Sequence, residues 1–143
     1  MAPARLGIAG LVSVMALLAV IPSTAVADPR SDMVNHVNAY RAAHGRAALA
    51  PSGYLARSSF AHARRVLRRN RFAHGASTSR RGEVLSIHYG SDLMISKVIE
   101  AWNNSVGHRN LLLDGSFRSV GAAYAQGRFN GRRTTVWVVR VQR

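Results

Sequence analysis

The hydrophobic period changes once along this chain, and that change decides the fold class. Up to residue 113, apolar side chains recur three and four positions apart, which is the spacing of helices that bury one face. Residues 117–125 and 134–141 are instead rich in β-branched, aromatic and small side chains, as strands are. The turn Phe129-Asn130-Gly131-Arg132 predicts that they pair as an antiparallel hairpin. The order predicts an α+β domain with helices packed on the faces of a small antiparallel sheet.

Three helices are expected before the strands. The first runs over Asp32–His44, with Ser31 as its cap and Gly45 just past its end. The second follows the Pro51-Ser52-Gly53 turn. The third is capped by Ser91, and its apolar stripe continues through 98–113 to a Ser-x-Gly-His-Arg turn. The stripe expected to be buried in the second helix consists of Leu55, Ser59, His62, Ala63 and Val66.

Residues 72–90 are polar and rich in turn formers, so we expect a loop that crosses a cleft, with a short strand at most over 84–87. The arginines of the second helix lie off its apolar stripe and should face solvent; they are Arg57, Arg64, Arg65, Arg68 and Arg69. We expect no aromatic residues to interleave with these arginines, so a stacking platform for single-stranded nucleic acid is not predicted.

The N-terminus has the three parts of a secretory signal. Arg5 precedes an apolar run over 6–21, and Pro22 and Ala25-Val26-Ala27 follow it. We expect cleavage after Ala27, which divides the chain into a signal peptide (1–27) and one secreted domain (28–143). The alternative is an uncleaved anchor, but the run is shorter than the roughly 20 residues that span a bilayer. No transmembrane segment is therefore expected after cleavage.

Composition limits both stability and partners. The chain has no cysteine, so packing and hydrogen bonds must stabilise the exported domain without disulfides. Lys and Arg number 20 against 6 Asp and Glu, for a net charge of +14, and Lys97 is the one lysine. Arginine binds phosphate and carboxylate through a planar fork, which favours anionic partners. A GC-rich coding sequence would produce the same excess of arginine without any partner.

A series of short motifs, in order along the chain, resembles the CAP superfamily, also called SCP-like, in its short bacterial cysteine-free form. The motifs are Asn38-x-x-Arg41-x-x-x-Gly45-x-x-x-Leu49, Ala61-His62-Ala63, Arg71-Phe72-Ala73-His74, Gly82-Glu83, Trp102-Asn103-Asn104-Ser105-Val106-Gly107-His108-Arg109 and Phe117-x-x-Val120-Gly121. Each is weak alone, but together they cover most of the mature chain.

The resemblance implies a three-layer α-β-α sandwich with a surface cleft lined by two histidines and one or two acids. Carried over position by position, the cleft residues are His74, Glu83 and His108. Ser105 stands where the family places a second acid. Glu100 does not replace that acid, because it falls about 150° from the apolar stripe at roughly 100° per residue and should be exposed.

Two imidazoles and one carboxylate form the ligand set of many zinc sites, so His74, His108 and Glu83 are candidate metal ligands. The alternative is a polar latch, in which both histidines hydrogen-bond Glu83 and hold two loops together. His62 lies on an apolar stripe and is expected to be a core histidine. No residue is assigned a catalytic role.

Three functions follow from these features. The first is a secreted, non-catalytic module that binds a lipid or another small ligand in the His/Glu cleft. The second is an extracellular hydrolase that uses a divalent metal such as zinc. The third is a cationic binder of anionic wall polymer, with nucleic acid disfavoured. Enzymatic activity is the less favoured alternative, and the sequence does not indicate an oligomeric state.

Overall fold

The computed structural model describes residues 27–76 and 78–143, so all but Ala27 of the predicted signal peptide lies outside the described residues. In chain order the elements are α1 (Pro29–Ala43), β1 (Ala50–Pro51), α2 (Gly53–Arg69), β2 (Arg81–Tyr89), α3 (Ile95–Asn103), α4 (Val106–Leu112), β3 (Ser119–Phe129) and β4 (Arg132–Gln142). None of the helices in these ranges is long and apolar enough to cross a membrane.

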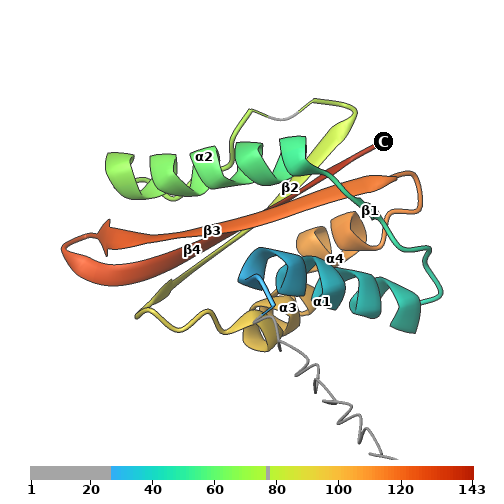
Figure 1. Ribbon diagram of the computed structural model, residues 1–143, viewed down its shortest axis with the longest axis horizontal. Helices are drawn as coiled ribbons and strands as arrows, with labels where there is room; N and C mark the ends of the chain where they lie inside the picture. Colours follow the sequence, from blue (N-terminus) through green and yellow to red (C-terminus); the bar gives the residue numbers. More distant parts are fainter. Residues whose placement is uncertain (1–26, 77) are drawn as a thin grey trace, which may run out of the picture.

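The four strands form one sheet in the order β1-β3-β4-β2. β4 lies between β3 and β2 and pairs antiparallel with both, whereas the two residues of β1 run parallel to β3. The helix α2 covers one face of the sheet, and α1, α3 and α4 cover the other (Figure 1). The α+β class and the three-layer α-β-α sandwich are therefore confirmed, with β1 making the sheet mixed.

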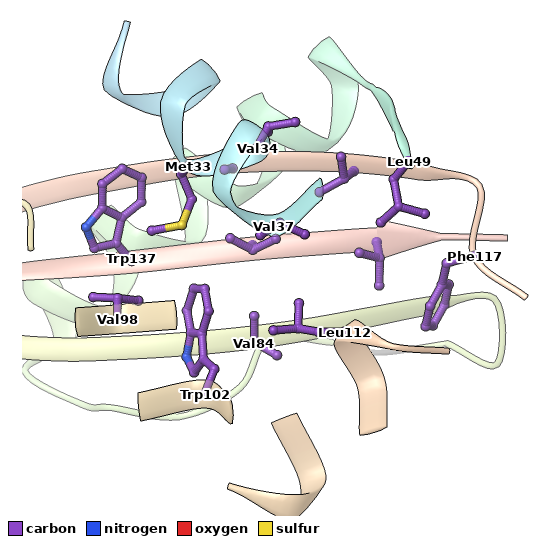
Figure 2. Close-up of a cluster of buried hydrophobic side chains, with 14 residues drawn as sticks. Met33, Val34, Val37, Leu49, Val84, Val98, Trp102, Leu112, Phe117 and Trp137 are labelled. Carbon is purple, nitrogen blue, oxygen red and sulfur yellow. The ribbon is translucent and has the colours of Figure 1, made fainter. Parts of the chain in front are cut away.

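The central strand β4 contributes to two separate cores. Val136 and Val138 pack under α2, while Trp137 and Val139 pack against the opposite helical layer. Figure 2 shows the larger core, in which the labelled side chains of α1, α3, α4 and the sheet converge. Trp102 is a core residue, as its place in the apolar stripe predicts, and it is 2% exposed. Its indole N–H donates to the Leu85 carbonyl at 2.8 Å.

The sequence pattern of α2 is confirmed residue by residue. Its buried side chains are the five predicted ones, Leu55, Ser59, His62, Ala63 and Val66. The Ser52 hydroxyl caps the helix by accepting the Leu55 N–H at 3.3 Å. All five arginines of the helix are exposed. The predicted hairpin is also confirmed, since Asn130 and Gly131 connect β3 to β4.

Two predicted helix starts were wrong. The first helix begins at Pro29 rather than at Asp32, because Asp28 caps it through its carboxylate and proline suits the first helical position. Ser31 lies inside that helix. Ser91 does not cap the third helix, which begins at Ile95 after Met94 turns the backbone with a φ of 49°.

Two further predictions need correction. The stretch 72–90 is not all loop, because nine of its residues form β2 in continuous register with β4. The full strand was not predicted because many of its side chains are polar. It forms because it pairs with β4, which is distant in the sequence. The apolar stripe of 98–113 is divided between α3 and α4. His108 therefore lies within a helix and not on a turn.

The contact between α2 and β3 depends on Gly121. A Cβ at this position would lie 2.2 Å from the Ala56 backbone nitrogen, and backbone cannot move aside as a side chain can. A Cβ at Gly127 would meet the flexible end of Leu67 at 3.2 Å.

We therefore predict that Gly121→Ala lowers the free energy of unfolding by roughly 2 kcal/mol or more, and Gly127→Ala by less than about 1 kcal/mol. Urea denaturation measures both, and equal losses would contradict this packing.

Candidate functional site

The predicted cleft residue Glu83 lies at the centre of a buried polar cluster. Its side chain is 7% exposed. The Oε1 atom accepts the Gly75 backbone N–H at 2.8 Å and lies 3.0 Å from His74 Nδ1. The Nε2 atom of His62 is 3.8 Å from the same oxygen. We call Glu83, His62, His74 and Arg140 the Glu83 cluster.

Arg140 neutralises the carboxylate from the neighbouring strand. Glu83 and Arg140 are direct register partners in β2 and β4. The Arg140 Nε and terminal Nη2 atoms lie 2.8 and 2.7 Å from Glu83 Oε2. Its other terminal nitrogen donates to the carbonyl and hydroxyl oxygens of Ser58 in α2. The pair thus joins α2, β2, β4 and the loop that carries His74.

The hydrogen bonds keep Glu83 ionised despite its burial. Burial raises the pKa of the carboxyl group and is the largest single influence, but the Gly75 N–H, the Arg140 guanidinium and the charge of His62 together outweigh it. The pKa of Glu83 is therefore lowered. Its contribution to stability is present above the ordinary glutamate pKa of about 4.3 and is lost as the pH falls through the folded-state value.

Of the remaining predicted cleft residues, His74 belongs to this cluster, whereas His108 and Ser105 lie within and at the start of α4. His74 is 58% exposed and bridges the cluster to solvent. His108 is partly buried in α4; burial, and secondarily the charge of His74, lower its pKa below the ordinary range. Ser105 occupies the cap position of α4 but its side chain makes no capping hydrogen bond. Glu100 is exposed, as predicted.

The arrangement does not fit a metal site. Within residues 27–76 and 78–143, no group of three or more His, Asp or Glu side chains is arranged so that it could hold a metal ion. The Oε2 atom of Glu83 is already paired with the Arg140 guanidinium. The Oε1 atom accepts the Gly75 backbone N–H and lies 3.0 Å from His74 Nδ1. A cation at Oε2 would have to displace a buried guanidinium, and one at Oε1 would compete with the Gly75 N–H. We therefore derive no chemistry from a metal.

Arg140 was not predicted from the sequence as a site residue, and His62 was predicted only as a core histidine. Arg140 is the one charged side chain between Val136 and Val141, and a charge in so apolar a strand signals a buried partner. His62 is 4% exposed, as expected of a core histidine, and its Nε2 lies 2.9 Å from the Ala73 carbonyl oxygen. Within the described residues its Nδ1 atom is buried without a hydrogen-bond partner.

A polar cavity of about 210 Å³ adjoins the cluster. Its wall combines α2 with the loop that follows, and the lining residues are His62, Arg65, Val66, Arg69, Arg71, Ala73, His74, Gly75 and Ala76. Three arginines and two histidines are thus among the residues that line one small volume.

Comparison with known protein families assigns the chain to one of them. The CAP profile, described as the cysteine-rich secretory protein family, matches residues 34–141. The chain belongs to the CAP family. A comparison with curated proteins found no match. The match lies wholly within the predicted domain of residues 28–143, and the cysteine-free sequence shows that this CAP domain does without the disulfides that the family name implies.

Solved structures share the fold of this CAP domain. An outer surface protein from Borrelia burgdorferi has a TM-score of 0.61 at 15% identity, over 82% of this chain and 96% of its own. An extracellular protein containing an SCP domain from Bacillus anthracis has a TM-score of 0.62 at 20% identity, over 80% of this chain and 40% of its own. At such identities the likeness establishes the fold alone.

The lowered pKa of His108 gives a prediction for the cleft of this CAP domain. We expect the imidazole to titrate below the ordinary value of about 6.5, because burial and the neighbouring His74 disfavour its protonated form. Stability should accordingly fall as the pH drops below that value. His74→Ala should raise the His108 pKa only part of the way to the ordinary value, because the effect of burial remains. NMR titration measures both, and an ordinary His108 pKa in the unsubstituted protein would contradict the arrangement.

Proposed function

We propose that this CAP domain is a secreted, non-catalytic module that binds an anionic group outside the cell. We infer export from the predicted signal peptide of residues 1–27, which would be cleaved from the domain of residues 28–143. The binding site in this proposal is the cavity lined by Arg65, Arg69 and Arg71, and the His/Glu cleft supports its wall. The single observation that carries the proposal is this group of guanidiniums around one polar volume.

A non-catalytic role is supported by the state of Glu83. A general base or metal ligand needs a lone pair that can reach a substrate or an ion. Glu83 instead accepts hydrogen bonds from Arg140 and Gly75 inside the protein. The chain also has no cysteine to act as a nucleophile. These contacts favour a fixed structural cluster over a reacting one.

An anionic ligand is supported by the charges around the cavity. The helix α2 contains no acidic residue. None of the ion pairs among residues 27–76 and 78–143 involves an arginine of α2 or Arg71. Their guanidinium groups are available to bind phosphate or carboxylate oxygens through two parallel hydrogen bonds. A wall polymer, a lipid headgroup and a small acid all carry such groups.

One expectation about this surface was wrong. An aromatic ring does lie among the arginines, because Phe60 on α2 is 41% exposed and the Arg64 guanidinium lies 5.8 Å from its centre. Tyr54, at the start of the same helix, is 57% exposed, and the Arg81 guanidinium lies 5.4 Å from its ring centre. Binding of single strands uses rings on which successive bases stack, whereas a guanidinium already lies beside each of these two rings. The surface therefore favours phosphate or carboxylate groups over the bases of a nucleic acid.

The proposal predicts a specific loss on removing the cavity arginines. The triple variant Arg65→Gln, Arg69→Gln, Arg71→Gln should bind inorganic polyphosphate at least tenfold more weakly, with a shallower salt dependence, because each lost phosphate contact lowers the slope of log K against log salt by about one. The measurement is fluorescence anisotropy over a range of NaCl concentrations. Parallel titrations with phosphatidylglycerol vesicles separate a polymer from a lipid headgroup.

The control variant Arg46→Gln, Arg57→Gln, Arg133→Gln removes the same charge from exposed positions outside the cavity. It should keep most of the affinity. Equal weakening of both triple variants would show that net charge alone governs binding and would overturn the site. Shortening of the polyphosphate during incubation would contradict the non-catalytic role.

A further inference from the structure

The outer edge of β3 lacks a strand partner over most of its length. β1 pairs only with Ser119 and Val120, whereas β3 continues to Phe129. In the described part of the chain no other strand lies beside this edge. An unpaired edge presents a row of backbone N–H and C=O groups, which is a template for another extended chain.

Two hollows follow this edge, one after the other. The first, of about 220 Å³, lies between α1 and the start of α2, with Val120 to Ala122 among its lining residues. The second, of about 420 Å³, is lined by Phe60 and Arg64 of α2 and by residues 124–126 of β3. Asp28 and Arg30 line both hollows. Together they form one groove along β3, lined by residues of α1 and α2, which we call the β3 groove.

The direction of the backbone groups can be worked out from β1. The carbonyl of Val120 points outward, because it accepts the Ser52 N–H at 2.7 Å. Successive residues of a strand point their backbone groups to alternate sides, and the pairing of β3 with β4 is continuous over 119–129. The outward groups beyond β1 therefore belong to Ala122, Tyr124, Gln126 and Arg128. An added strand would continue the line of β1 where the chain turns into α2.

The side chains of the groove indicate what kind of strand it accepts. The first hollow is apolar, with Val34, Pro51 and Ala56 in its wall, and suits a small aliphatic side chain. At the second hollow, Arg64 has no ion-pair partner among the described residues, and the exposed ring of Phe60 lies beside it. Asp28 is the one acidic residue that lines the groove, and it forms an ion pair with Arg30, whose Nε lies 3.1 Å from Asp28 Oδ2.

Charge also decides against a second copy of this chain. Two β3 edges paired with each other would bring together two molecules of net charge +14, each with Arg64 at the contact. Like charges placed side by side disfavour such pairing. We infer that the β3 groove is a docking site for an extended, acidic peptide segment of a partner protein, which adds as a strand to β3 and places an aliphatic side chain in the first hollow.

The test uses an end-capped octapeptide of alternating valine and glutamate. On titration into the protein, the backbone amides of Ala122, Tyr124 and Gln126 should shift in NMR spectra. The same peptide methylated on every backbone amide should bind at least tenfold more weakly, because it cannot donate to the edge. A valine–lysine octapeptide should also bind at least tenfold more weakly. Equal binding of the methylated peptide would overturn the inference.

A matched pair of variants tests the edge from the protein side. Gln126→Pro removes an outward N–H at an exposed position, whereas Gln126→Ala removes the same side chain and keeps the N–H. The proline variant should bind the peptide at least fivefold more weakly than the alanine variant. If the proline variant fails to fold, the methylated peptide still decides the question.

The site of the shifts separates this inference from the proposed function. Shifts confined to Arg65, Arg69 and Arg71 would show the peptide acting as a polyanion in the cavity, which would overturn the β3 groove and leave the proposed function standing. Shifts of the β3 amides that depend on protein concentration without peptide would identify a second copy as the occupant and would likewise overturn it.

Discussion

The ion pair between Glu83 and Arg140 is the interaction on which the rest of the cleft depends. Both side chains are more than nine-tenths buried, and they face each other across β2 and β4. A buried carboxylate is costly unless it is paired and hydrogen-bonded, and here the Arg140 guanidinium and the Gly75 N–H meet that need. Because Arg140 also reaches Ser58, the pair fixes α2 against the sheet.

This pairing changes what the family motif means in the present chain. The histidines and the glutamate are at the positions that the motif predicts, yet the glutamate faces an arginine rather than a second acid or a metal. A Cβ at Gly75 would meet the Arg140 guanidinium at 2.5 Å, so the loop also needs a glycine there. In our proposal the motif therefore acts as a structural joint between layers, and the ligand binds beside it.

The sequence predicted those features that depend on local spacing. The five buried residues of α2 and the hairpin turn at Asn130 follow from periodicity and turn chemistry. Features that depend on distant partners escaped it. β2 is a strand because β4 pairs with it, and Ser91 fails as a cap because Met94 turns the backbone before α3. The cleft histidines and Glu83 were predicted from the resemblance to the family, and the motifs behind that resemblance do not include Arg140.

A thermodynamic double-mutant cycle between Glu83 and Arg140 tests the central claim most directly. Glu83→Gln and Arg140→Met should each lower the free energy of unfolding by about 3–5 kcal/mol, because each leaves a buried partner uncompensated. The double variant should lose far less than the sum, with a coupling energy of at least about 2 kcal/mol. Additive losses in urea denaturation would show that the two side chains act independently and would contradict the account.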